Sequence, residues 1–470
     1  MTGLDIAIVI GYFGIIIGIG IYSSKKADTS ENYLVAGRRC GYGFTFACLC
    51  AVMLGGASTI GTTALGYTFG ISGIWLVAML GLGLALVGVF LIRQIKKMKI
   101  LTVAQLLTKR FGSKAGVLGA IVSAVYTMMV CATQIIAMGT ILQGLAGWDA
   151  TLSMLVVGLI VVVYTILGGM WAITLTDFIQ FILIAIGVMF VMLPFSVNAA
   201  GGFTAISELP SSYFNLTSIG WPTIIQYFFL YCLGALVGQD IWQRYMTAKS
   251  VKVARRSGVA AGVFILAYAV ACALIGMAAQ VFMPGASSSQ LVFATMAESV
   301  LPTGALGIVL VAVLAVLMST ASGTLLASAS LLTNDVIKPL VAFRDSQTGK
   351  DTLDEAEADK RILHASKRAT AGIGVFAIIV AIALNDVLAA LDVSYAILSG
   401  ALFFPIIMAL FWKRATPRAA LISIGCSTVV VLIGLMLQGT TAVMPIIWGV
   451  IVSFALMVGI TLFDTRKSND

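Results

Sequence analysis

Charged residues are scarce in this sequence. Asp, Glu, Lys and Arg make up 10% of the 470 residues, whereas soluble domains carry about 25%. Hydrophobic residues make up 60%, and the mean hydropathy is +1.06. A chain of this composition has too little polar material to cover a soluble surface, so the sequence predicts an all-α integral membrane protein.

Histidine and paired cysteines are also lacking. His364 is the single histidine and lies in a charged stretch, and the seven cysteines form no CxxC pair. Most of these cysteines fall within apolar runs, where they are expected to act as small buried hydrophobic residues. The sequence has neither a metal cluster nor a Ser/His pair nor paired acids at membrane depth, so we expect no enzymatic activity.

Long apolar runs are what the chain has in abundance. A membrane helix needs about 20 mostly apolar residues, and this rule predicts thirteen spans. They cover approximately 4–22, 43–69, 71–95, 116–145, 151–168, 171–196, 219–243, 256–283, 303–332, 367–385, 388–412, 416–437 and 441–463. The first run has no basic leader or small-residue cleavage site, so it is interpreted as a spanning helix.

The basic residues predict how these spans are oriented. With the N-terminus outside the cell, all 28 Lys and Arg residues fall in cytoplasmic segments and none lies at membrane depth. The positive-inside rule therefore predicts a cytoplasmic C-terminus. It also accounts for the net charge of +9 without a nucleic-acid partner. The mixed-charge segment 334–366 is interpreted as a solvated cytoplasmic linker.

Acids are few at membrane depth. Asp177 and Asp240 fall within spans or at their inner ends, while Asp386 and Asp392 are placed in outer loops or at span ends. No intramembrane Lys or Arg is expected to neutralise an anionic solute. Asp177 could neutralise a cation, relay a proton, cap a helix or form an ion pair.

One apolar span carries an unusual stripe of hydroxyl groups. The stretch LMSTASGTLLASAS, residues 317–330, contains Ser319, Thr320, Ser322, Thr324, Ser328 and Ser330. Hydroxyl and carbonyl oxygens are hard neutral ligands that suit an alkali cation. The alternative is that these hydroxyls bond to carbonyls of their own helix or of a neighbouring one.

The second span contains a candidate partner for this stripe. Gly55 and Gly56 lie near its middle and are followed by Ser58 and Thr59. A glycine pair weakens a helix, and discontinuous helices mark the substrate and ion sites of secondary transporters. Close packing of small residues is the alternative explanation for the pair.

Five ordered segments resemble the sodium:solute symporter family, which includes proline, pantothenate, glucose and sialic acid transporters. They are SENYLVAGRR (30–39), TVAQLLTKRFG (102–112), GGMWAITLTDFIQ (168–180), GQDIWQRYMTAKSVKVARR (238–256) and STASGTLLASASLLTNDV (319–336). The resemblance spans about 4–437 and implies a leucine-transporter-type fold. In that fold two inverted five-helix repeats, here 43–196 and 219–412, have broken first and sixth helices. Segment 1–42 would add one N-terminal helix, and segment 413–470 would add two C-terminal helices and a short tail.

The resemblance also implies ligands for sodium, the coupling ion. The principal site would use carbonyls of Ala51, Leu54 and Val316 with hydroxyls of Ser319 and Thr320. A second sodium, bound in some family members, would use Asp177 and Ser322, but Gly323 stands where another serine is expected. Solute contacts are expected from residues near the two breaks: Gly55, Gly56, Ser58, Thr59, Gln134, Tyr231 and Gly234.

The resulting functional prediction is sodium-coupled symport of a small organic solute into the cell by alternating access, in the plasma or inner membrane. The solute is left open among monocarboxylates, amino acids and other small polar molecules. Two alternatives remain at this point. A proton-coupled symporter of the same fold would rest on Asp177, and a solute sensor would keep the fold without transport.

Overall fold

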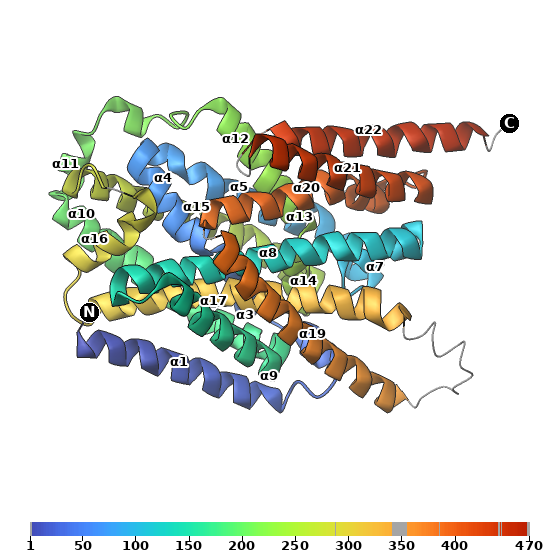
Figure 1. Cartoon of the computed structure of the whole chain (residues 1–470), viewed down its shortest axis with the longest axis horizontal. Coiled ribbons are helices and arrows are strands. Elements are labelled where there is room, and N and C mark those ends of the chain that lie inside the picture. Colours follow the sequence, from blue (N-terminus) through green and yellow to red (C-terminus); the bar gives the residue numbers. More distant parts are fainter. Residues whose placement is uncertain are drawn as a thin grey trace.

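The computed structural model describes residues 2–286, 288–340, 355–384, 386–439, 442 and 444–467. These residues form helices, joined by one isolated β-bridge between Cys40 and Ala248. Most long helices run side by side along the longest axis of the molecule, with the N-terminus at one end and the C-terminus at the other (Figure 1). The all-α prediction agrees with this arrangement.

Ten helices in the described part of the chain are long and apolar enough to cross a membrane, or eleven when one bent pair is counted as a span. The prediction of thirteen differs because two of these helices, Ala57–Met98 and Ala150–Ala199, run to 42 and 50 residues. At 1.5 Å per residue each is about twice the length that a 30 Å hydrocarbon core requires. Both contain a glycine with positive φ, Gly70 and Gly169, at the boundaries predicted from the sequence.

Gly169 interrupts α9 (Ala150–Ile184) with φ 51° and ψ −144°. A Cβ atom at this position would lie 2.4 Å from the ring of Tyr33 and 2.6 Å from its carbonyl oxygen. Only glycine therefore permits both the backbone angle and the close approach of α2 (Ser30–Val35).

The remaining elements keep the order of the predicted spans. Flanking the core are α1 (Gly3–Ser24), α21 (Pro417–Gln438) and α22 (Met444–Lys467). The core contains α3 (Tyr42–Met53), η2 (Ala57–Gly61), α4 (Thr62–Phe69), α5 (Trp75–Leu86), η4 (Val87–Leu91), α6 (Ile92–Met98), α7 (Val103–Phe111), α8 (Ser113–Ala146), η5 (Ala185–Met192), α10 (Leu193–Ala199), α12 (Trp221–Tyr227), η7 (Phe228–Cys232), α13 (Leu233–Val237), α14 (Gln239–Thr247), α15 (Val251–Phe282), α16 (Val292–Val300), α17 (Ala305–Leu331), η9 (Leu332–Ile337), α19 (Glu355–Leu384) and α20 (Val387–Phe411). Short helices η1 (Ala36–Arg38), η3 (Gly70–Ile74), α11 (Gly202–Ser207), η6 (Ser211–Phe214) and η8 (Ser289–Leu291) lie in the connections.

Two core helices are broken, as predicted. The first ends at Met53, and Leu54 takes an extended conformation (φ −88°, ψ 91°) before the chain becomes helical again at Gly56. The other breaks at Gly238 (ψ 126°), where α12–α13 and α14 meet at 44°. We expected the second break around Tyr231 and Gly234. Both residues are helical, and the chain leaves the helical conformation only at Gly238, four residues after Gly234.

The hydroxyl-rich helix α17 is the centre of the bundle. Every residue from 309 to 331 is buried, with α8, α9 and α1 packed around it (Figure 1). Asp5 of α1 accepts hydrogen bonds from the backbone of Gly304 at 2.9 Å and Gly307 at 3.0 Å. The extra N-terminal helix thus caps the helix that carries the stripe. The division into repeats at 43–196 and 219–412 stays a prediction.

The predicted linker 334–366 is partly helical. Its residues up to 337 belong to η9, and those from Glu355 onward begin α19. Residues 341–354 lie outside the described residues.

Candidate ion and solute site

The Thr320 hydroxyl lies among backbone carbonyls at the break of the first core helix. Its Oγ1 is 3.2 Å from the Ala51 oxygen, 3.4 Å from that of Leu54 and 3.3 Å from that of Val316, with the Val52 oxygen at 3.5 Å. Ligands of hard cations such as Ca²⁺ lie about 2.3–2.6 Å from the ion, so two at right angles are roughly 3.3–3.7 Å apart. The distances from the Thr320 hydroxyl to these carbonyls are close to those expected for two oxygens bound to one cation.

Four of the five predicted ligands of the principal sodium site are thus brought together. The fifth, Ser319, directs its hydroxyl elsewhere and donates to Asp177 Oδ1 at 2.5 Å. Among the described residues no group of three or more His, Cys, Asp or Glu lies together, so the carbonyl and hydroxyl oxygens here suit an alkali ion better than a transition metal.

The rest of the stripe has structural partners. Ser328 donates to the Ala124 carbonyl of α8 at 2.9 Å, while Thr324 and Ser330 donate to carbonyls of their own helix. Ser322 donates to the Ser319 carbonyl at 3.1 Å. Helix–helix or intrahelical bonding thus accounts for four of the six hydroxyls, as the alternative explanation of the stripe proposed.

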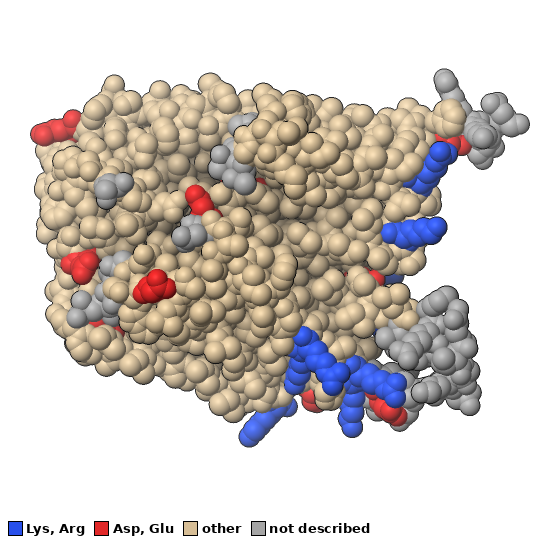
Figure 2. All heavy atoms as spheres, viewed as in Figure 1, with Lys and Arg blue, Asp and Glu red and all other residues tan. Residues whose placement is uncertain are grey.

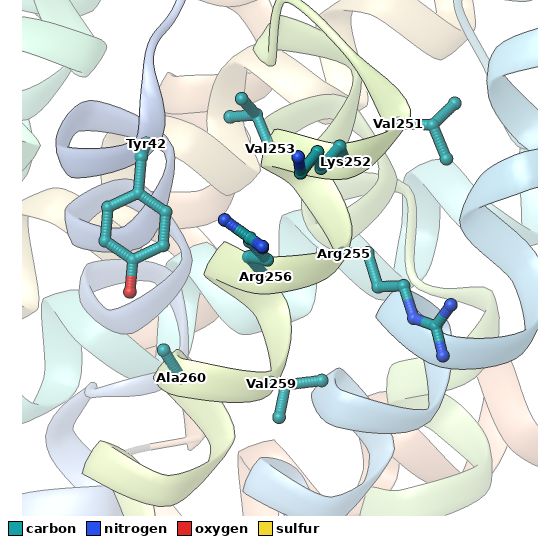
Figure 3. Close-up of a pocket in the computed structure, with 8 residues that line it drawn as sticks. All are labelled: Tyr42, Val251, Lys252, Val253, Arg255, Arg256, Val259 and Ala260. Atoms are coloured by element: carbon teal, nitrogen blue, oxygen red, sulfur yellow. The ribbon is translucent and has the colours of Figure 1, made fainter.

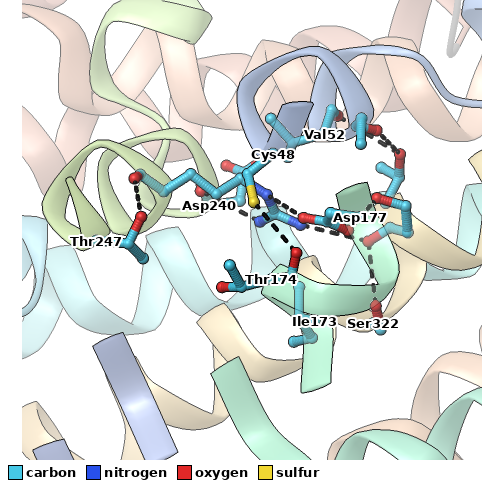
Figure 4. Close-up of polar contacts among 12 residues, drawn as sticks. Cys48, Val52, Ile173, Thr174, Asp177, Asp240, Thr247 and Ser322 are labelled. Carbon is cyan, nitrogen blue, oxygen red and sulfur yellow. Dashed lines mark hydrogen bonds and ion pairs between the residues drawn. The ribbon is translucent and has the colours of Figure 1, made fainter. Parts of the chain in front are cut away.

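One basic residue that the sequence placed in a cytoplasmic segment, Arg244, is buried in the bundle. Its side chain is completely buried in α14, the second half of a broken span, and Nε lies 3.4 Å from Asp177 Oδ2. Both carboxylate oxygens of Asp177 are therefore directed at partners within the bundle (Figure 4). Counting Lys and Arg by loop missed Arg244 because it is only one turn from the exposed basic stretch at 249–256.

Arg244 is also tied to the backbone. Nη2 donates to the Ser319 carbonyl at 3.3 Å, and Nη1 donates to the Asp240 carbonyl at 3.4 Å. Ser319 is itself one of the predicted sodium ligands, so the guanidinium contacts the backbone of the predicted principal site. The ion pair links α9 of the first predicted repeat to α14 of the second.

A small cavity lies beside the Thr320 cluster, with a volume of about 20 Å³. Its polar walls come from Ser58, Gln134, Asp240 and Thr320, and its apolar walls include Leu80, Leu391 and Tyr395. About 10–15 Å³ is enough for one water molecule. The cavity therefore accepts an ion or a water in this conformation, and the helices must separate before a solute fits.

The predicted solute residues fall into two groups. Gly55, Ser58 and Gln134 line the cavity. Gln134 Oε1 accepts from the Gly56 amide at 2.8 Å, which stabilises the start of the second half-helix. A Cβ atom on Gly55 would lie 2.7 Å from the same oxygen, so glycine is what lets Gln134 reach the break.

The other solute candidates do not line this cavity and contact other side chains. Thr59 shares a hydrogen bond of 2.7 Å with Tyr268, and Tyr231 donates to Asp392 at 2.5 Å. Gly234 packs against Tyr395, whose ring a Cβ atom would approach to 2.6 Å. Asp392, placed by the sequence in an outer loop or at a span end, is buried within α20. A solute role for these residues stays a prediction.

Hydrogen bonds tie α14 to two distant segments of the chain. Gln239 accepts from the Val103 amide at 2.8 Å and donates to the Leu101 carbonyl at 3.1 Å, while Gln243 donates to the Leu34 carbonyl at 2.5 Å. The motif 238–256 is thus hydrogen-bonded to two other segments that carry the family resemblance, 30–39 and 102–112. Asp240, Arg244, Tyr126 and Tyr395 were not predicted as site residues. The polar sequence of α14 at the end of an apolar span is the signal that could have identified Asp240 and Arg244.

Comparison with known proteins agrees with these features. Residues 33–426 match the model of the sodium:solute symporter family. The high-affinity proline transporter PutP of Bacillus subtilis is 26% identical over 88% of this chain and 89% of its own. The sodium/proline symporter of Staphylococcus aureus (strain JH9) is 26% identical over 90% and 84%.

Solved structures identify the fold. A substrate-bound, outward-open Na⁺-coupled sialic acid symporter superposes with a TM-score of 0.84 at 20% identity, covering 98% of both chains. The nucleobase-cation-symport-1 family transporter Mhp1 in a closed conformation gives 0.61 at 15% identity, covering 94% of this chain and 96% of its own. The predicted leucine-transporter-type fold is confirmed. The chain belongs to the sodium:solute symporter family and is a sodium-coupled symporter.

Proposed function

We propose that this protein uses sodium to take up a small zwitterionic solute, such as an amino acid, by alternating access. The observation that carries the coupling mechanism is the position of the Thr320 hydroxyl, 3.2–3.4 Å from carbonyls of Ala51, Leu54 and Val316. Sodium bound to these atoms and to Ser319 would hold the broken first core helix against α17. Because α17 is buried on all sides, this contact ties the mobile break to the centre of the bundle.

The choice of solute rests on the cavity. The Asp240 carboxylate, buried and within reach of the Tyr126 hydroxyl at 3.3 Å, is part of its wall. A carboxylate in a site of low dielectric favours a ligand with a positively charged group. The first turn of the half-helix after Gly55 has backbone amides that favour a carboxylate. An α-amino acid has both groups, and the two relatives described above are named for proline.

The test is uptake by purified protein in liposomes with an imposed inward sodium gradient. A panel of radiolabelled solutes would include proline, other amino acids, a monocarboxylate and a sugar. We expect one or more amino acids to accumulate in sodium but not in choline, and a proton gradient alone to drive nothing. Uptake confined to a monocarboxylate or sugar would contradict the assignment of Asp240, and uptake driven by protons without sodium would contradict the coupling ion.

We also propose that the basic end of the molecule is cytoplasmic. On the face shown in Figure 2, Lys and Arg gather at the end where the C-terminus lies, whereas Asp and Glu occur at both ends. The positive-inside rule then places the C-terminus inside and the N-terminus outside.

A labelling experiment tests this orientation. In a Cys426→Ser background, whose remaining cysteines are buried, we expect Ser211→Cys to react with an impermeant maleimide on intact cells. Lys413→Cys, which is exposed at the basic end, is expected to react only after permeabilisation. The reverse pattern would invert the topology.

A further inference from the structure

The N-terminal helix α1 has one face that is buried in the bundle. Its buried residues are Asp5, Tyr12, Ile16, Gly20 and Ser23, and their spacing of three, four and seven places them along one side of a helix. This side packs against α9 and α17 (Figure 1), while many of the remaining side chains of α1 are exposed. Tyr12, which is 5% exposed, brings a polar group to the middle of the buried face.

The Tyr12 hydroxyl is hydrogen-bonded in both directions. It accepts from Gln180 Nε2 of α9 at 2.8 Å and donates to the Met318 sulfur of α17 at 3.7 Å. Gln180 is buried, and its Oε1 has no hydrogen-bond partner among the described residues, so the contact with Tyr12 is what orients this amide. A helix that precedes both predicted repeats thus joins one helix of each repeat.

Met318 lies in the turn of α17 that carries predicted sodium ligands. Val316 precedes it by two residues, and Ser319 and Thr320 follow it directly. The Met318 carbonyl accepts from the Tyr164 hydroxyl of α9 at 3.3 Å. The side chain and the backbone of Met318 are therefore both held by tyrosines, one from α1 and one from α9.

A second contact fixes the start of the same helix. Besides the hydrogen bonds from the backbone of Gly304 and Gly307 to Asp5, the two helices pack closely here, since a Cβ atom on Gly307 would lie 2.9 Å from the Asp5 Cα atom. Helix α1 thus contacts α17 at its first turn and again at the ligand-bearing turn. With two fixed points, α17 cannot slide along α1 or rotate about its own axis without losing one of these contacts.

The position of this turn matters because cation ligands tolerate little displacement. Ligands of hard cations lie about 2.3–2.6 Å from the ion, and the groups that form such a site have to be held within about 0.5 Å of the productive geometry. A turn that is already held in place needs little further ordering when sodium binds. A turn that is free to move has to be ordered by the ion, at the expense of affinity.

We propose that Tyr12 is a positioning residue of the principal sodium site. Its hydroxyl holds Met318, and through Met318 the ligand-bearing turn of α17, in the place that sodium requires. The inference rests on the proposed function, since it concerns the site of the coupling ion. It gives α1, which lies outside both predicted repeats, a part in ion coupling.

The experiment measures the sodium affinity of Tyr12→Phe. This change removes one oxygen atom and keeps the ring, so the protein is expected to fold. Equilibrium binding of ²²Na⁺ to the purified protein gives Kd, which we expect to rise about three- to tenfold, the equivalent of one hydrogen bond. Sodium-driven uptake should keep its maximal rate at saturating sodium, because the loss is one of ion binding.

Two further variants show whether Met318 transmits the effect. Met318→Leu conserves the volume of the side chain but removes the sulfur acceptor, so it should raise Kd by a similar factor. In the double variant Tyr12→Phe/Met318→Leu, the Kd should be no higher than in the single variants, because both changes remove the same contact.

The matched control removes the same atom from a tyrosine elsewhere in the molecule. Tyr42 is exposed at the start of α3, where it lines a groove of about 1120 Å³ together with the first turns of α15 (Figure 3). Tyr42→Phe should bind sodium with the Kd of wild type.

Any one of four results would overturn the proposal. They are an unchanged Kd in Tyr12→Phe, an unchanged Kd in Met318→Leu, an equal rise in Tyr42→Phe, and factors that multiply in the double variant. A merely structural role of Tyr12 would lower the melting temperature and leave Kd as it is, which is the first of these results. No saturable binding of ²²Na⁺ to wild type would instead contradict the proposed function.

Discussion

Replacing Ser319 and Thr320 together by alanine is expected to abolish the stabilisation of the purified protein by sodium. A ligand that binds only the folded state adds RT ln(1 + [L]/Kd), about 2.7 kcal/mol at a hundredfold excess over Kd. The double variant loses both predicted side-chain ligands and keeps only the carbonyls of Ala51, Leu54 and Val316. Thermal unfolding in NaCl compared with choline chloride at equal ionic strength measures the difference.

A control variant that removes another hydroxyl of α17 distinguishes loss of sodium binding from a general loss of helix stability. Thr324 lies one turn further on, and its hydroxyl donates to the Thr320 carbonyl of its own helix at 2.8 Å. Thr324→Ala should therefore keep the full sodium response, even if its melting temperature changes. A wild-type protein that melts at the same temperature in both salts would refute the assignment of the principal site, as would a double variant that still responds.

The second large effect is expected at Gly276, where α15 crosses α4. A Cβ atom here would lie 2.2 Å from the Thr63 carbonyl oxygen and 2.6 Å from the Tyr67 amide nitrogen. Both neighbours are backbone atoms, so the clash cannot be relieved by rotation of a side chain. Overpacking costs about 1–3 kcal/mol, and we expect Gly276→Ala to reach or exceed the upper value.

The consequence would extend to transport, since α4 continues the half-helix that carries Ser58. Melting temperature in detergent and sodium-driven uptake should fall together. Gly18→Ala on α1 is the control, because no atom lies within 4 Å of the position of its Cβ. If Gly276→Ala had the same melting temperature as wild type, the close packing of α4 against α15 would be contradicted.

Parts of the site that depend on residue type within a helix were predictable from the sequence. The glycine pair at 55–56 predicted the first break, and hydroxyls on α17 predicted an oxygen-rich site. Both follow from local chemistry, because glycines weaken helices and hydroxyls need partners in lipid. The carbonyls of Ala51 and Leu54 carry no side-chain signal, and only the family resemblance predicted them.

Arg244 and Asp392 were not predictable in the same way. Each lies near the end of an apolar run, where the sequence analysis places a charged residue outside the membrane. Their burial is decided by tertiary contacts: Asp177 and the space left by Gly323 for Arg244, and the Tyr231 hydroxyl for Asp392. The break at Gly238 was placed a turn too early for a related reason. A π-helical segment, 228–232, keeps Tyr231 within the helix.

The ion pair between Arg244 and Asp177 also adds nothing to the driving force for transport. A charge that is part of the protein returns with it in every cycle, so it adds no net charge movement and draws nothing from the ion gradient. One sodium crossing 100 mV releases about 2.3 kcal/mol, and a tenfold concentration difference adds about 1.4. For a neutral solute this work supports an accumulation of roughly 500-fold, whereas two ions would support the square of that ratio. The number of sodium ions that cross with each solute, and not the charges fixed in the bundle, therefore sets the gradient that the transporter can sustain.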